Sequence, residues 1–167
     1  NEKTSSENKE KILAALRSTI VSSTYWRLRN SAITQLGVLL GNAALDEASI
    51  AAILTALKKD KSWIRANEIR VLGNTRDLSH VDFYIEALND PSDRVISAAA
   101  TALGKSKSPK AFNALAKLVN KPSMKSQSLL SALSGLKELG DPRGFDIAYK
   151  ALANLNLPRW RLPTPIA

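Results

Sequence analysis

Apolar side chains recur along most of the chain at the three- and four-residue spacing of an α-helix. Within residues 46–59, for example, Ile50, Ile53, Leu54 and Leu57 fall on one helical face. Short stretches with Asp, Ser, Pro or Gly separate such segments, and these residue types are typical of helix ends. The pattern predicts an all-α chain of short amphipathic helices. N-caps are expected at Asp46, Ser79, Ser108 and Asp141.

One pattern recurs three times and ends each time in Leu-Gly. The copies are STYWRLRNSAITQLG (23–37), KDKSWIRANEIRVLG (59–73) and DPSDRVISAAATALG (90–104). Each copy has an apolar residue at its sixth position with an arginine beside it. We expect the glycines of these Leu-Gly pairs to cap the helices at their C-termini, where a positive φ favours glycine. A fourth, less regular copy covers 122–140.

Another helical segment precedes each copy, so the repeating unit is a pair of helices. Such repeats predict an α-α superhelix, a solenoid of about four and a half helical hairpins in which each hairpin packs on the next. We expect a single domain over 1–167 that is a fragment of a larger protein. Its units are expected at 7–41, 46–74, 78–106, 108–140 and 141–157, with an extended tail at 158–167 that Pro163 and Pro165 keep from forming a helix.

The third copy has a helical face with very little bulk. Val95, Ala98, Ala99, Ala102 and Leu103 share one side of the helix at the spacing i, i+3, i+4, i+7, i+8. Alanines at these positions allow neighbouring helices to approach closely. We therefore interpret this face as the contact between successive repeats.

The repeats resemble known families of helical-repeat proteins. Asp90-Pro91, Arg94-Val95, Ala98-Ala99-Ala100 and Leu103-Gly104, with Leu139-Gly140-Asp141-Pro142-Arg143 at a unit junction, resemble short bacterial HEAT-like repeats of the phycobilisome-lyase type. That resemblance implies an armadillo-like α-solenoid that serves as a protein-binding scaffold. Fold analogy alone also suggests a lyase-like chaperone for cofactor attachment.

A narrower resemblance concerns the two tryptophans. Trp26-Arg27-Leu28-Arg29 and Trp63-Ile64-Arg65 resemble the helical-repeat region at the C-terminus of bacterial gluzincin-type zinc aminopeptidases. The chain would then be an accessory part of a metallopeptidase whose catalytic domain lies elsewhere, in a periplasmic or secreted protein. Otherwise a cytoplasmic location is expected, and the absence of cysteine does not decide between these compartments.

The sequence contains no recognisable catalytic, cofactor-binding or metal-binding pattern. His80 is the only histidine and there is no cysteine, so an HExxH zinc site and thiolate ligands are excluded. No GxSxG elbow or glycine-rich phosphate loop is present. We expect this chain to have no enzymatic activity and no cofactor. No apolar run is long enough for a membrane-spanning helix, so no membrane partner is expected.

The charge is strongly uneven. The chain carries a formal net charge of +9, and residues 101–167 contain 11 basic and 3 acidic residues. Between Thr101 and Lys137 every charged residue is a lysine. Such a surface attracts phosphates or acidic proteins, or it is simply a solvated face.

The second helix of each hairpin lines the concave side in this type of fold, which gives a candidate binding face. We expect a protein partner there, or a neighbouring domain of the same polypeptide. Nucleic acid is the alternative partner, because HEAT-like alkylpurine DNA glycosylases combine basic and aromatic side chains on this face, although their motif is not matched residue by residue. The tryptophans also suit a structural role at the end of the core. The candidate residues are Trp26, Arg27, Arg29, Trp63, Arg65, Arg70 and Arg94.

Glu68 departs from the pattern, because it occupies the position that Ala32 and Ala99 hold in the other copies. A carboxylate on a packing face is costly without a partner. We expect Glu68 to form a structural salt bridge with Arg29, Arg65 or an arginine of the adjacent repeat.

Overall fold

The computed structural model describes residues 2–41, 45–121 and 127–153, and within these ranges all regular elements are helical. The all-α class is therefore confirmed. In chain order the elements are α1 (Glu2–Ser22), α2 (Trp26–Leu40), α3 (Glu47–Leu57), α4 (Ser62–Gly73), the 3-10 turn η1 (Leu78–His80), α5 (Val81–Ala87), α6 (Asp93–Ser106), α7 (Pro109–Val119), α8 (Gln127–Leu139) and α9 (Arg143–Ala153).

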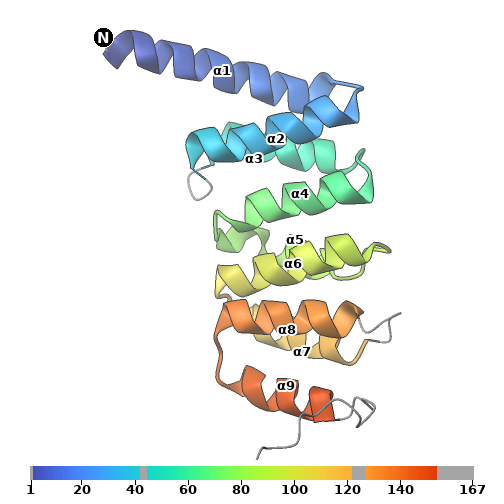
Figure 1. Cartoon of the computed structure of the whole chain (residues 1–167). Helices are drawn as coiled ribbons and strands as arrows, with labels where there is room; N and C mark the ends of the chain where they lie inside the picture. Colours follow the sequence, from blue (N-terminus) through green and yellow to red (C-terminus); the bar gives the residue numbers. More distant parts are fainter. Residues whose placement is uncertain (1, 42–44, 122–126, 154–167) are drawn as a thin grey trace, which may run out of the picture.

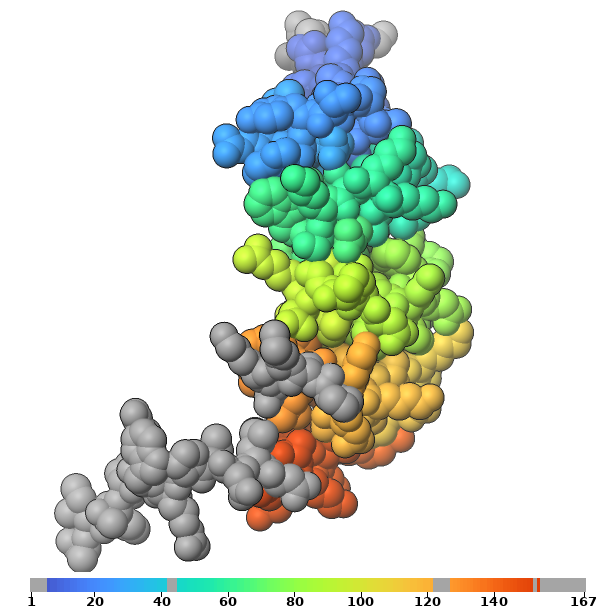
Figure 2. Space-filling view, turned by 90° about the vertical axis from the view of Figure 1, so that its right-hand side faces the viewer, coloured from blue at the N-terminus to red at the C-terminus, as the bar shows by residue number. Residues whose placement is uncertain are grey.

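The helices stack in chain order into a superhelix, as the repeats predict (Figure 1). Helices α2, α4, α6 and α8 form one layer, and α3, α5 and α7 form the layer behind it. In Figure 2 the stack bows toward the α3, α5 and α7 side, which makes α2, α4, α6 and α8 the inner helices. The expected tail at 158–167 and the end of the last unit lie outside the described residues.

The core runs along the stack between the inner and outer layers. On α6 the small face is buried as predicted, and Ala99, Ala100 and Leu103 have no exposed surface. This helix packs on both α4 and α8. The small side chains thus bring three inner helices into close contact, which is the basis of the continuous stack.

The glycines of the first three Leu-Gly pairs do not cap their helices with a positive φ, so the prediction is wrong for these three copies. Gly37 and Gly104 lie inside α2 and α6, and Gly73 is the last residue of α4. A Cβ added to Gly73 would lie 2.5 Å from the Cβ of Ala102 on the next inner helix. Gly73 and Gly104 therefore serve close helix packing. Gly140, which ends the fourth copy directly after α8, does have a positive φ, as predicted. Positive φ also occurs at Gly41, Arg76 and Lys107.

The predicted N-caps are largely found. Asp46 accepts a hydrogen bond from the Ser49 N–H at the start of α3, and Ser108 accepts one from Lys110 at the start of α7. Asp141 accepts one from the Arg143 N–H, where α9 begins. The exception is Ser79, because Asp77 caps this region and Ser79 lies within the 3-10 turn.

Candidate functional site

Two of the predicted binding arginines instead join neighbouring repeats. The Arg29 guanidinium on α2 pairs with the fully buried Asp60 carboxylate in the loop before α4, and it also donates to the Ser23 carbonyl at 2.6 Å. Arg65 on α4 pairs with Asp90 before α6 at 2.9 Å, and donates to the Asp60 carbonyl at 2.8 Å. Both arginines are therefore inter-repeat clamps, with little capacity left for a partner.

The two predicted tryptophans come together on the inner face. The rings of Trp26 and Trp63 stack with centroids 4.3 Å apart and planes at 32°. Trp26 packs partly against the core, while Trp63 remains 40% exposed. The guanidinium of Arg27 lies over Trp26, 5.1 Å from the ring centroid. The structure thus combines both roles considered for tryptophan, with Trp26 extending the core and Trp63 facing outward.

Beside the tryptophans lie two asparagines that the sequence analysis did not single out. The Asn67 side-chain nitrogen donates to Asn30 Oδ1 at 3.0 Å and to the Thr34 hydroxyl at 3.2 Å. Each asparagine follows a tryptophan by four residues, one turn along the same helical face. This repeated Trp-x-x-x-Asn spacing is the signal that would have found them.

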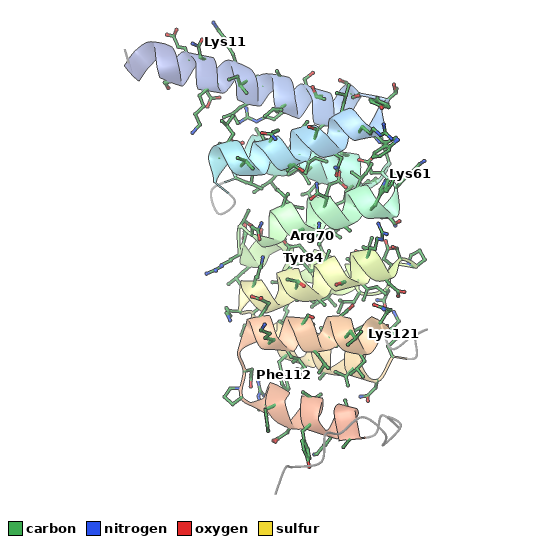
Figure 3. All side chains as sticks on the ribbon, viewed as in Figure 1. Lys11, Lys61, Arg70, Tyr84, Phe112 and Lys121 are labelled. Carbon is green, nitrogen blue, oxygen red and sulfur yellow. The ribbon has the colours of Figure 1, made fainter. Side chains whose placement is uncertain are left out.

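These side chains line two adjoining hollows along the inner helices, which together we call the inner groove. One part, of about 270 Å³, lies between α2 and α4, and a second, of about 410 Å³, lies between α4, α6 and the start of α8. Both parts share Trp63 and Arg70, and Figure 3 places Arg70 between α4 and α6. We define the inner groove by Trp26, Asn30, Trp63, Asn67, Arg70 and Arg94.

The inner groove is positively charged. Arg70 and Arg94 are exposed, and the structure shows no hydrogen bond or ion pair for either among the described residues. A further hollow beside Trp63 and Arg94 adds Lys61. Asp93 is the acidic residue that lines these hollows. Two arginines and a lysine thus face one carboxylate.

Several lysines between Thr101 and Lys137 contact neighbouring repeats and do not line the inner groove. Lys105 donates to Asn74 at 2.6 Å, Lys110 pairs with Asp82 at 2.8 Å, and Lys121 donates to the Leu88 carbonyl at 2.9 Å. Lys107 donates to carbonyls at the end of α8, among them Leu139 at 2.9 Å. These four lysines link residues of adjacent repeats, so much of the predicted phosphate-attracting charge is engaged in holding the stack together. Lys125 lies outside the described residues.

The predicted salt bridge of Glu68 is wrong. Its side chain is completely buried, and neither carboxyl oxygen has a hydrogen-bond partner or an ion pair within the part of the chain that the structure describes. Burial, and after it the negative charge of Asp60, raise the pKa of Glu68 to about 8. The carboxyl is therefore mainly neutral at pH 7. Arg29 and Arg65 are held by Asp60 and Asp90, which leaves neither arginine for Glu68.

The described residues contain no group of three or more His, Cys, Asp or Glu side chains placed to hold a metal ion. His80 lies 3.6 Å from the carboxylate of Asp77, beside the Ser79 hydroxyl. Among the helices in the described ranges, none combines the length and the apolar character that crossing a bilayer requires.

Comparison with known proteins identifies the family. No curated protein matches the chain. The solved complex of CpcE and CpcF of phycocyanin lyase from Nostoc sp. PCC7120 is similar, with a TM-score of 0.62 and 23% identity, over 89% of this chain and 65% of that chain. At this identity the likeness shows the fold, and this chain spans only about two thirds of that relative's length. The family model of HEAT repeats matches residues 50–134, half of the chain. The chain therefore belongs to the HEAT-repeat proteins.

Proposed function

We propose that this chain is a non-catalytic HEAT-repeat scaffold whose inner groove binds a protein partner or a neighbouring domain of the same polypeptide. The exposure of Trp63 carries this proposal. A large aromatic side chain that is 40% exposed, beside two arginines that have no hydrogen bond or ion pair within the described part of the chain, has the composition of an interface hot spot.

The clamps between repeats support a preformed binding surface. Arg29, Arg65 and Lys121 each join successive repeats through charged or carbonyl partners. A groove whose walls are fixed in this way loses little conformational freedom when it binds a partner. The inner groove is thus suited to docking a folded domain or a protein segment without rearrangement.

The structural relative also favours a protein partner. It is a complex of CpcE and CpcF, and its fold is similar to that of this chain. Assembly with a second polypeptide is therefore the simplest use of this superhelix here.

If the groove binds a neighbouring domain of the same polypeptide, the aminopeptidase resemblance suggests that this domain is the catalytic domain of a zinc aminopeptidase. The chain would then be the C-terminal part of a zinc aminopeptidase. The encoding reading frame tests this proposal. An HExxH motif upstream of Asn1 would support it, and a start codon directly before Asn1 would contradict it.

The alternative is nucleic-acid binding of the alkylpurine DNA glycosylase type. The stacked tryptophans beside Arg70 favour it, because aromatic rings next to cations bind unpaired bases. The engagement of the lysines with neighbouring repeats and the presence of Asp93 in the groove favour the protein partner instead.

Affinity purification with matched variants tests the scaffold proposal. A protein retained by the wild-type chain should be lost with Trp63→Ala combined with Arg70→Ala, because both changes remove groove contacts. Lys117→Ala on the outer helix α7 is the control and should retain it. Equal retention by all three proteins would show that the inner groove is not the docking surface.

A further inference from the structure

We propose that the occupant of the inner groove is an acidic segment of a partner protein, bound in an extended conformation. This inference rests on the proposed scaffold function and specifies the partner. It is carried by three features of the groove, namely its unused amide atoms, its charge and its length.

The asparagine pair leaves one hydrogen-bond donor and one acceptor unused. Because Asn67 Nδ2 donates to Asn30 Oδ1, the acceptor Asn67 Oδ1 and the donor Asn30 Nδ2 have no hydrogen bond among the described residues. Together they complement the N–H and C=O groups that an extended backbone presents. A helix uses these backbone groups internally, so it would not satisfy the pair.

The charge of the groove selects an acidic segment. Arg70 on α4 and Arg94 on α6 line the same part of the groove, beside the exposed ring of Trp63. An arginine guanidinium binds a carboxylate through two parallel hydrogen bonds. Since Asp93 is the one carboxylate among the described residues lining these hollows, the arginines outnumber the acids there, and the complementary segment carries Asp or Glu.

The length of the groove fits a short extended segment. Packed helices lie roughly 8–10 Å apart, and an extended chain advances about 3.3 Å per residue. One step between inner helices therefore corresponds to about three residues of a bound segment. The path from α2 to α8 then takes about nine residues.

A peptide explains these features better than a nucleic-acid strand does. A strand presents a phosphate at every nucleotide, and its affinity depends on several free cations along the path. Here Lys105 and Lys121 hold neighbouring repeats, and Asp93 would face the phosphates. The amide pair, in contrast, matches a peptide backbone directly.

Selection from a display library of random peptides of about twelve residues tests the inference. Peptides selected on the wild-type chain should be enriched in Asp and Glu. When the selected peptides are synthesised with a fluorescent label, their affinity should fall at least tenfold for Arg70→Glu and for Trp63→Ala. Lys117→Glu makes the same charge change on the outer face and should bind within twofold of wild type. Thermal unfolding of each variant checks that it is folded.

The other outcomes separate this inference from the function on which it rests. Selected peptides without acidic residues that still require Trp63 would overturn the acidic partner but support a docking groove. Peptides insensitive to both groove variants would overturn both proposals. No enrichment over blank resin would overturn the inference, as would tighter, Arg70-dependent binding of a labelled oligothymidylate of similar length.

Discussion

Glu68 has an environment that the rest of the core does not share. It replaces the alanine of the other copies on a packing face, and its carboxyl lies in the field of the buried Asp60 carboxylate. The positive charge of Arg29 neutralises the charge of Asp60, but it cannot neutralise a second negative charge on Glu68 as well. The second carboxyl therefore stays protonated, and its ionisation works against folding.

Glu68→Gln should remove a pH dependence of stability. The folded pKa of about 8 lies above the unfolded value near 4.5, so the protonated side chain favours folding below pH 4.5, and this contribution is lost as the pH rises to 8. We expect the variant to have similar stability to wild type at pH 5 and to be about 2–4 kcal/mol more stable at pH 8. Urea unfolding at both pH values measures this. If the stability difference between Glu68→Gln and wild type were the same at pH 5 and pH 8, it would contradict a buried neutral carboxyl at Glu68.

Tyr84 on α5 has a buried hydroxyl without a hydrogen-bond partner in the described residues (Figure 3). Burial raises the pKa of the phenol, so it remains neutral. We expect Tyr84→Phe to leave stability unchanged or to raise it by about 1 kcal/mol, because it removes a desolvated polar atom. Thermal unfolding measures the effect, with the exposed Tyr149→Phe as control. A marked drop in melting temperature for Tyr84→Phe alone would show that the hydroxyl has a partner.

At the scale of the element, the crossing of α6 and α8 depends on the absence of side chains. A Cβ on Gly135 would lie 2.5 Å from the Ala100 carbonyl oxygen and 2.6 Å from Leu115 Cδ2. The backbones of the two helices therefore approach each other more closely than an alanine would permit. This contact fixes the spacing of the last described pair of inner helices.

Gly135→Ala should destabilise the protein by about 1–3 kcal/mol, since overpacking outweighs the better helix propensity of alanine. Gly144→Ala on α9 is the matched control, because its Cβ would meet Leu136 at an ordinary 3.5 Å. We expect the control to be neutral or slightly stabilised. Chemical unfolding measures the stability of both variants. Equal changes in the free energy of unfolding would contradict the close approach of α6 and α8 at Gly135.

The sequence predicts the elements well because their signals are local. Helical spacing, the caps at Asp46 and Ser108, and the small face of α6 all involve neighbouring residues. The role of glycine was predicted wrongly at Gly73 and Gly104 but correctly at Gly140, because Leu-Gly looks the same at a helix crossing and at a helix end. The repeat register also misleads at its sixth position, where Ile64 is buried and Leu28 is 53% exposed.

At the scale of the molecule, polar contacts between repeats determine which charges remain available. The sequence indicated the inner face and its tryptophans, and the structure brings these together with Arg70 and Arg94. The sequence did not reveal that Arg29 and Arg65 form ion pairs with Asp60 and Asp90, because the partner of an arginine depends on how the next repeat packs. Asn30 and Asn67 were missed for the same reason.

This distribution of charge predicts weak, non-specific DNA binding. With a net charge of +9, the chain should bind a labelled duplex at low salt, and the affinity should fall steeply between about 50 and 200 mM salt. Arg70→Ala should change it less than threefold, because we propose that the inner groove binds an acidic segment and not DNA. Fluorescence anisotropy measures both effects. Binding that persists at 200 mM and requires Arg70 would favour the glycosylase-type alternative.

The emission of Trp63 tests most directly whether a partner segment occupies the inner groove. The chain has three tryptophans, so Trp26→Phe with Trp160→Phe leaves Trp63 as the single reporter and keeps an aromatic ring beside it. Titration with a selected acidic peptide should shift its emission to shorter wavelength, because the half-exposed ring loses contact with water. An unchanged spectrum at a peptide concentration that saturates binding would contradict the account.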